Sequence, residues 1–270
     1  MTSDASKFTG SIPENYDRGL GPHIFVDFAD EIARRAASFM PRRVLEIAAG
    51  TGIVTRKLRD KLAPDCALVA TDLNPPMLEI AKAKINPGER VDFAQANAME
   101  LPFGDGDFDL AVCQFGVMFF PDKDKSFREV QRVLKPGGHY LFNVWDTFEH
   151  NGYARIAHET AGEFFKGDKP AFYLTPTGYA KLDPIKTSLQ VAGFAEIKFE
   201  VLQLKKQVPH ARLFAEGLVL GNPIVAEIQE RASAPPQVIV EALEVALHRE
   251  YGPDPMTVPL QAILVQATRP

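Results

Sequence analysis

The fold is decided by the stretch VLEIAAGTGIVTRKL, residues 44–58. An apolar run ends in Glu46, a turn of small residues follows, and apolar residues then recur at helical spacing. This order predicts a strand, a tight turn and a helix start, the layout of a nucleotide-binding crevice at the carboxyl end of a first strand. Gly50 and Gly52 have no Cβ, so the chain can turn sharply there and a ligand can lie on the backbone. The helix beginning near Gly52 would point the positive end of its dipole into the same crevice.

Acids at the ends of two predicted strands indicate which ligand the crevice holds. Glu46 lies four residues before Gly50, where it would repel a dinucleotide pyrophosphate and attract a cation. Asp72 closes the next apolar run, Leu68–Asp72, twenty residues after Gly52. An acid at the end of a second strand can accept both ribose hydroxyl hydrogens. Together the acids favour a ligand that joins a positive charge to an adenosine, as S-adenosylmethionine does.

At these residues the sequence resembles the class I S-adenosylmethionine-dependent methyltransferases, and within them the branch of the ubiquinone and menaquinone C-methyltransferases. The resemblance covers residues 40–145 and follows the family order through Val44–Gly52, Thr71–Met77, Asn97–Phe103, Phe108–Asp122 and Val133–Val144. One Gly-x-Gly turn is a weak signal, whereas five ordered stretches are a strong one. Two positions depart from the family. Ala48 stands at the first glycine of acid-x-Gly-x-Gly-x-Gly, and Asn97 replaces the acid usual after the third strand.

The resemblance implies an α/β fold with a doubly wound, Rossmann-like sheet of seven strands, mostly parallel with an antiparallel last strand, and helical cap insertions. The alternation of strands and helices between residues 43 and 145 also favours a parallel, doubly wound sheet. We predict a single methyltransferase domain. Its parts are a leader in 1–40, a cofactor-binding core in 41–148, cap insertions in 150–182 and 209–252, and a sheet edge in 185–208 and 256–268.

Three local expectations can be compared directly with a structure. Residues 1–15 are polar and are expected to be poorly ordered. One leader helix is expected over residues 22–39, ended by Pro41. Residues 136–138, Pro-Gly-Gly, are expected to turn the chain into a fifth strand over 139–145.

The resemblance also assigns roles in binding the cofactor. Glu46 would hold the ammonium end, and the turn from Ala48 through Gly50 to Gly52 would let the methionine part approach. The other candidates are Asp72 and the adjacent Leu73 at the ribose, Met77 at the adenine face, Asn97 and Ala98 at the adenine edge, and Gln114 and Tyr16 as bordering groups. Alternatives stay open: core packing for Met77, a backbone turn for Asn97, and a salt bridge or helix cap for the acids.

Catalytic residues are harder to identify from sequence. Methyl transfer from a sulfonium is an in-line displacement that needs alignment and exclusion of water but no protein nucleophile. A general base would be needed for a hydroxyl, phenol or enol acceptor. His150 follows the predicted fifth strand on the active side of the sheet and is the candidate base. Lone histidines are more often non-catalytic, so this assignment has a structural alternative.

Composition limits the classes of partner. The chain has 270 residues, is 46% hydrophobic and carries a net charge of −5, which suits a globular protein with a sizeable core. Basic residues occur in pairs, not in a long cluster, so no nucleic-acid partner is predicted. Cys66 and Cys113 form neither a disulfide framework nor a metal-ligand spacing. No apolar run reaches about 18 residues, and no signal peptide is recognised, so we expect a cytoplasmic protein without a membrane span.

We therefore predict an S-adenosylmethionine-dependent methyltransferase, monomeric or homodimeric, that acts on a small or medium, rather apolar or aromatic acceptor. A nicotinamide oxidoreductase is the alternative enzyme class. It is disfavoured by Glu46, by Thr55 at the third glycine of Gly-x-Gly-x-x-Gly, and by the lack of a Tyr-x-x-x-Lys pair. A non-catalytic protein that binds S-adenosylmethionine is the third class. The acceptor atom, whether carbon, nitrogen or oxygen, stays open.

Overall fold

The computed structural model describes residues 4–270, which group into two compact units. The core unit consists of Val26–Val144, Lys181–Val201 and Ile263–Pro270. The cap unit consists of the described residues up to Phe25 together with Trp145–Ala180 and Leu202–Ala262. The predicted leader and cap segments thus fall mainly in one unit, and the predicted cofactor-binding segments fall in the other. The assignment of a single domain stays a prediction.

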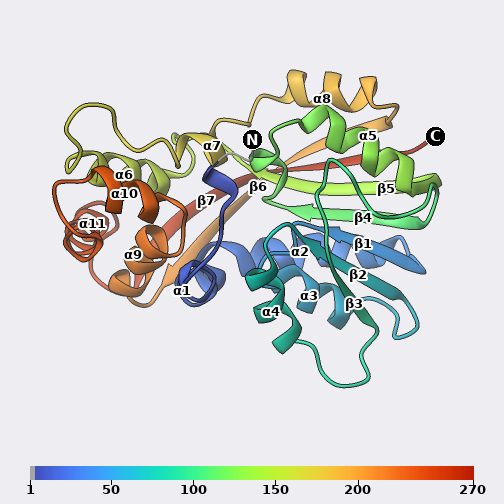
Figure 1. Ribbon diagram of the computed structural model, residues 1–270, viewed down its shortest axis with the longest axis horizontal. Coiled ribbons are helices and arrows are strands. Elements are labelled where there is room, and N and C mark those ends of the chain that lie inside the picture. The colour runs from blue at the N-terminus through green and yellow to red at the C-terminus, as the bar shows by residue number, and fades with distance from the viewer. Residues whose placement is uncertain (1–3) are drawn as a thin grey trace. The chain divides into compact units, whose positions relative to one another are not determined.

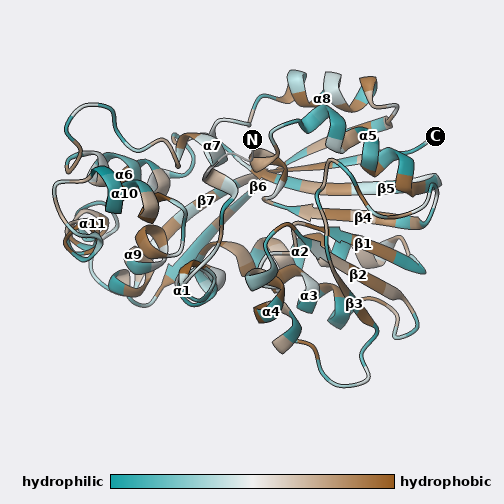
Figure 2. Cartoon of the chain, in the orientation of Figure 1, coloured by the Kyte–Doolittle hydropathy of each residue, from teal (hydrophilic) through white to brown (hydrophobic). Residues whose placement is uncertain are grey.

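A seven-stranded sheet with the order β3-β2-β1-β4-β5-β7-β6 forms the scaffold of the chain (Figure 1). Its first five strands pair in parallel, with Val44 opposite both Leu68 and Leu110. A parallel sheet is covered on both faces, so its strands are continuous apolar runs, and apolar residues follow the central strands in Figure 2. The strands are β1 Arg43–Ile47, β2 Ala67–Asp72, β3 Val91–Gln95, β4 Phe108–Gln114, β5 Leu134–Trp145, β6 Ala195–Val208 and β7 Met256–Thr268.

The last strand runs antiparallel to its neighbours, as expected. At one end of β5 the Arg269 amide donates to Gly138 O at 2.8 Å, and at the other end the Asp146 amide donates to Gln261 O at 3.2 Å. In the direction in which residue numbers increase along β5, they decrease along β7, so the two strands are antiparallel. The contacts of Arg269 also explain a difference from the expected boundaries. The segment Pro136–Gly138 is part of β5 instead of a turn before it, because its backbone pairs with the end of the chain.

The helices of the core unit bury one apolar stripe each against the sheet or against another helix. Helix α2 packs on α3, and α5 packs on α8. Asp122 begins α5 by accepting the Lys125 amide at 2.8 Å, a typical N-cap. The helical elements of this unit are α2 Val26–Ser38, α3 Ile53–Lys61, α4 Pro75–Ala83, η3 Val117–Phe119, α5 Lys123–Val133 and α8 Leu182–Val191.

The cap unit is helical apart from its portions of β6 and β7. Helix α9 packs on α1 and α11, and α11 also packs on α6. The turns at Asn222-Pro223 and at Pro235 separate α9, α10 and α11, as prolines in first turns predict. The elements are η1 Asp4–Ser6, α1 Ile12–Gly19, η2 Gly21–Phe25, α6 Gly152–Gly162, α7 Leu174–Thr177, α9 Ala211–Leu220, α10 Ile224–Arg231 and α11 Pro236–Tyr251.

One expectation for the amino-terminal part was wrong. Residues 4–15 are not a poorly ordered lead-in, because α1 begins at Ile12 and packs on α9; residues 1–3 lie outside the described part of the chain. The leader helix expected over 22–39 is confirmed, since the chain is helical from Gly21 to Ser38, with a π-helical first turn, η2, that continues directly into α2. A helix as short as α1 depends on tertiary packing, which local sequence does not show. None of the described helices is long and apolar enough to cross a membrane.

Candidate cofactor site

The crevice predicted from the sequence corresponds to the turn of the core unit where β1 ends and α3 begins. Gly50 has φ +56° and Gly52, the N-cap of α3, has φ +79°, a left-handed region that favours glycine. A Cβ on Gly52 would lie 2.7 Å from the Ala81 Cα of α4, so glycine lets these helices approach. A Cβ on Gly50 would meet no atom within 4 Å. The turn is therefore closely packed at Gly52 and has open space beside Gly50.

The departure from the family at Ala48 has a backbone consequence. Ala48 has φ +55°, in the same left-handed region as the two glycines. The first glycine of the family motif would adopt this conformation freely, whereas a residue with a Cβ is disfavoured by about 1–2 kcal/mol. The alanine thus keeps the turn but stores strain beside the crevice, a common property of binding sites.

Glu46 is a buried acid with an unsatisfied oxygen. Its side chain is 1% exposed, and within residues 4–270 no hydrogen-bond partner is found for its Oε2. Burial raises the pKa of Glu46 to about 8, since the charged form loses its hydration, and neighbouring Asp72 adds to the rise. Thr55 of α3 opposes the rise by favouring the charged form, and its influence on the pKa is larger than that of Asp72, although no hydrogen-bond partner is found for its hydroxyl within residues 4–270. Without a ligand the site therefore favours a neutral carboxyl, and a cation placed beside Oε2 would satisfy it.

Asp72 joins the end of β2 to the glycine turn. One carboxylate oxygen accepts the Gly50 amide at 2.8 Å, and the other accepts the Asn74 amide at 2.8 Å. Burial raises the pKa of Asp72, although these amide donors oppose the rise. The Asn74 side-chain amide also donates to Oδ1, at 3.3 Å, so the further lone pair that can accept a ribose hydroxyl is on Oδ2. The backbone of Leu73 is held alongside, since Nε2 of the Gln95 side chain donates to Leu73 O at 3.0 Å.

The adenine candidates lie beyond β3 and on α4. The Met99 amide donates to Asn97 Oδ1 at 3.0 Å, so the side chain of Asn97 does form a local turn. Its amide nitrogen and the second lone pair of its oxygen can still bind a ligand. Ala98 beside it is buried. Met77 of α4 is 4% exposed, so it is also part of the packed interior.

Known proteins with the same sequence pattern identify the chain. The family of methyltransferase domains matches residues 45–142. A ubiquinone/menaquinone biosynthesis C-methyltransferase of Hahella chejuensis is 42% identical over 101 residues, which cover 36% of this chain and 41% of that protein. An enzyme of the same name from Rickettsia felis is 31% identical over 189 residues, which cover 64% of this chain and 76% of that protein. The chain belongs to the class I methyltransferase family.

A solved structure agrees with this membership. Phosphoethanolamine N-methyltransferase 2 of Haemonchus contortus, in complex with S-adenosyl-L-methionine, has a TM-score of 0.61 at 20% identity, over 99% of this chain and 59% of that chain. At this identity the likeness shows the fold, which confirms the predicted doubly wound sheet. The family's cofactor is S-adenosylmethionine. The crevice fits it, because an unsatisfied buried carboxyl oxygen lies at Glu46 and open space lies beside Gly50.

One residue of this family member was missed by sequence reasoning. Asn143 of β5 is fully buried, and its Oδ1 and its backbone oxygen both accept the Phe115 amide, at 3.1 and 3.0 Å. Its amide nitrogen lies 3.4 Å from Gln114 Oε1, at the end of β4. Phe115 has φ +52°, so Asn143 holds a strained backbone in place. A polar residue within the apolar run of residues 140–145 was the available signal.

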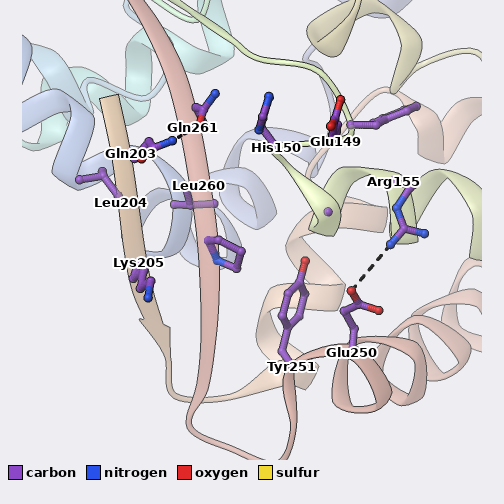
Figure 3. Close-up of a pocket in the computed structure, with 13 residues that line it drawn as sticks. Glu149, His150, Arg155, Gln203, Leu204, Lys205, Glu250, Tyr251, Leu260 and Gln261 are labelled. Carbon is purple, nitrogen blue, oxygen red and sulfur yellow. Dashed lines mark hydrogen bonds and ion pairs between the residues drawn. The ribbon is translucent and has the colours of Figure 1, made fainter. Parts of the chain in front are cut away.

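The cap unit holds a cavity of about 810 Å³, and His150 is on its wall (Figure 3). His150 is exposed, and in Figure 3 it lies on the segment that leads into α6. Tyr251, Arg155 and Lys205 also line the cavity, so a phenol and cationic groups face the same space. Arg155 is paired with Glu159 at 2.9 Å and with Glu250 at 3.8 Å. A cavity of this size accommodates a small organic molecule.

Amide groups fix one wall of this cavity. Gln261 of β7 donates to Asp146 Oδ2 at 2.7 Å, and its own Oε1 accepts from Gln203 of β6 at 2.7 Å. Asn151, which is fully buried, donates to Gln261 O at 2.9 Å and accepts the Gln261 amide at 3.0 Å. Polar groups held on several sides keep their orientation, so this wall is preformed.

Tyr16 belongs to the cap unit, unlike the other cofactor candidates. Its ring stacks on Phe25 with centroids 4.9 Å apart, and it forms a T-shaped pair with Phe8 whose centroids are 5.7 Å apart. Glu46, Ala48, Gly50, Gly52, Asp72, Leu73, Met77, Asn97, Ala98 and Gln114 all belong to the core unit. The assignment of Tyr16 to the cofactor stays a prediction.

Proposed function

We propose that this chain transfers the methyl group of S-adenosylmethionine to a small or medium organic acceptor by in-line displacement. The observation that carries the proposal is the pair of buried acids in one crevice, Glu46 with an unsatisfied oxygen and Asp72 bound to the Gly50 amide. Together they complement an ammonium at one end of the ligand and a ribose at the other. A dinucleotide pyrophosphate brings no cation that could stabilise the charged form of Glu46.

The residues of the core unit have separable roles in this proposal. Glu46 binds the ammonium group and becomes charged as it does so. Gly50 leaves room for the methionine part, and Asp72 accepts the ribose hydroxyls. Asn97 and the Ala98 amide bind the adenine edge. Bound in this way, the cofactor supplies an electrophilic methyl carbon with a good leaving group, so the chain needs only to align an acceptor and exclude water.

The cavity of the cap unit is our candidate for the acceptor site. Its lining combines apolar side chains such as Phe148 and Leu260 with the polar groups of Tyr251 and His150. For a phenol, enol or hydroxyl acceptor, His150 accepts the proton that the acceptor loses when the new bond forms. The names of the two relatives make a quinone precursor with a carbon acceptor the first compound to test.

Calorimetric titration of the full chain tests the cofactor assignment. S-adenosylmethionine and S-adenosylhomocysteine should bind, and NAD should give no heat. Binding of NAD alone would favour the oxidoreductase. A chain that binds S-adenosylmethionine but methylates none of a panel of quinone, phenol and amine acceptors would favour the non-catalytic class.

We expect no nucleic-acid partner, because the net charge is −5 and basic residues occur only in pairs. A monomer or homodimer in the cytoplasm is the expected form. Size-exclusion chromatography with light scattering measures the first, and fractionation of cells measures the second.

A further inference from the structure

The loop between β3 and β4 contains the proposed adenine site and has no helix or strand of its own, apart from an isolated β-bridge between Asn97 and Glu100. It comprises residues 96–107 and is longer than most connections in compact proteins. A loop of this length needs contacts with other elements if it is to hold one conformation. In the structure those contacts come mainly from one arginine of α5.

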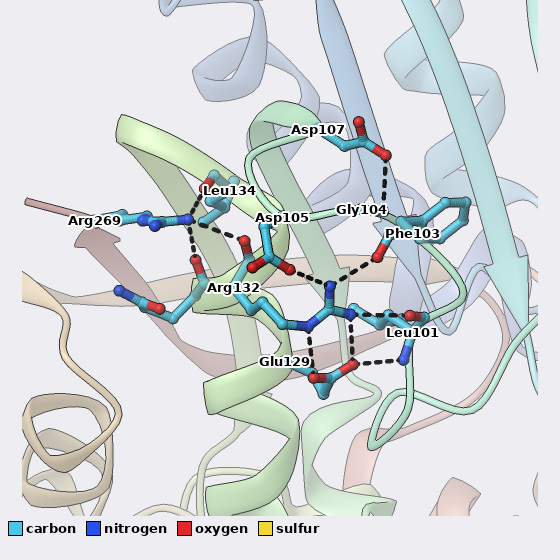
Figure 4. A network of polar contacts seen from close by, with 10 residues as sticks. Leu101, Phe103, Gly104, Asp105, Asp107, Glu129, Arg132, Leu134 and Arg269 are labelled. Atoms are coloured by element: carbon cyan, nitrogen blue, oxygen red, sulfur yellow. Dashed lines mark hydrogen bonds and ion pairs between the residues drawn. The ribbon is translucent and has the colours of Figure 1, made fainter.

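Arg132 uses all five of its N–H donors on this loop and on its neighbour Glu129 (Figure 4). Nη1 donates to Phe103 O at 2.7 Å and to Asp105 Oδ1 at 2.8 Å. Nη2 donates to Leu101 O at 3.0 Å and to Glu129 Oε2 at 2.8 Å, and Nε donates to Glu129 Oε1 at 2.8 Å. The planar guanidinium therefore ties three points of the loop to α5.

Glu129 completes this arrangement, which we call the Arg132 clasp. Its Oε2 accepts the Leu101 amide at 2.8 Å, so Leu101 is held by both its N–H and its C=O. The hydrogen bond from Arg132 lowers the pKa of Glu129, which keeps this carboxylate charged. The side chains of Glu129 and Arg132 are 19% and 31% exposed, so water competes with the clasp only in part.

The clasp lies immediately after the turn that carries Asn97. Before the turn, the Ala96 amide donates to Asp72 O at 3.0 Å, which ties the loop to the proposed ribose acid. Within it, the Glu100 amide donates to Asn97 O at 2.9 Å. Leu101 follows directly. The residues between Ala96 and Leu101 are thus held at one end by β2 and at the other end by the clasp.

We infer that Arg132 and Glu129 are positioning residues for adenine: they fix the turn of residues 97–100 so that Asn97 and the Ala98 amide meet the adenine edge. This inference rests on the proposed function, because it assumes that the ligand is an adenosine. Neither residue touches the cofactor. Both hold the loop in its binding conformation before the ligand arrives, so ligand binding does not include the entropy cost of ordering the loop.

The test compares Arg132→Gln with Arg56→Gln. Arg56 of the same unit also forms a two-pronged pair, with Glu89 at 2.5 and 2.6 Å, but it does not contact residues 96–107. We expect Arg132→Gln to weaken S-adenosylhomocysteine binding about tenfold, the scale of one hydrogen bond, and to leave kcat at saturating cofactor unchanged. Arg56→Gln should keep the affinity of the original chain.

A second ligand separates positioning from general stability. S-inosylhomocysteine carries an oxygen in place of the adenine amino group and a hydrogen on N1, so a correctly placed Ala98 amide, which can donate to N1 of adenine but not to that N–H, should discriminate against it together with Asn97. The original chain should prefer S-adenosylhomocysteine, and Arg132→Gln should lose most of that preference. Glu129→Gln, which keeps an oxygen for the Leu101 amide, should give a smaller loss of the same kind and covers the case in which Arg132→Gln does not fold.

The outcomes separate the inference from the proposed function. If the original chain binds neither S-adenosylmethionine nor S-adenosylhomocysteine, the proposed function is wrong. If it binds them but the Arg132 and Glu129 variants keep its affinity and its preference, the inference alone is overturned. Equal losses in the Arg132 and Arg56 variants would also overturn it, since they would indicate a general effect of stability.

Discussion

Replacing Glu46 by glutamine tests the buried acid at the centre of the crevice. A carboxyl with a higher pKa in the folded than in the unfolded state binds its proton more tightly when folded. The free energy of unfolding then falls as pH rises from the unfolded value to the folded one. For Glu46 those values are 4.5 and about 8, so the loss begins above pH 4.5 and levels off above about pH 8. Glutamine does not titrate, so Glu46→Gln should lack this slope.

The magnitude follows from the pKa shift. Each pH unit between the two pKa values lowers the free energy of unfolding by about 1.4 kcal/mol. The ligand-free protein should therefore lose about 3 kcal/mol between pH 4.5 and pH 7 through this residue, partly offset by relaxation around the site. The difference in unfolding free energy between Glu46→Gln and the original chain should grow by that amount over the same range.

Urea unfolding of the ligand-free protein at several pH values measures the effect. Glu79→Gln is the matched control, because Glu79 lies on an exposed part of α4 and pairs only with Lys82 at the surface within the described chain. Its unfolding curve should keep the pH dependence of the original protein. If Glu46→Gln also keeps that pH dependence, the reasoning that Glu46 is a buried carboxyl that is neutral at pH 7 is refuted.

The release of a proton on ligand binding tests the protonation of Glu46 independently. An ammonium beside Glu46 favours the carboxylate, so binding of S-adenosylmethionine near pH 7 should release up to about one proton. Titrations in two buffers with different ionisation enthalpies measure that release. The release should vanish in Glu46→Gln, along with much of the affinity. Identical heats in both buffers for the original chain would contradict the reasoning.

Three further substitutions test other parts of the proposed sites, with Gly88→Ala as a control for the first. Gly50→Ala and Gly88→Ala place a Cβ at positive φ with no atom within 4 Å, so both should lose about 1 kcal/mol of stability, but only Gly50→Ala should weaken cofactor binding, as calorimetry would show. Asp72→Ala should weaken cofactor binding by about 1–3 kcal/mol, and unchanged affinity would remove its assigned role. His150→Ala should slow turnover about 10²-fold or more at unchanged cofactor affinity, whereas full activity would exclude it as the base.

Much of the core unit could be predicted from sequence because its signals are local. Strand β1 and the turn to α3 follow from an apolar run, small residues and helical spacing. The positions of Glu46 and Asp72 follow from the rule that the ends of parallel strands meet at one edge of a sheet. Gly50 and Gly52 adopt the left-handed conformations that their lack of a Cβ permits.

The sequence by itself thus determined the fold of the core unit and the family, and it predicted a cofactor site at the ends of β1 and β2, since these depend on residues close together in the chain. Only the tertiary structure showed that α1 is ordered by α9, that Asn143 holds the strained backbone at Phe115, and that Arg132 holds the loop of residues 96–107. Each of these depends on groups distant in sequence, and hydrogen-bond partners across such distances leave no local pattern. The same reason explains why the unsatisfied oxygen of Glu46 became visible only in the packed structure: a missing partner can be recognised only when every neighbour is in place.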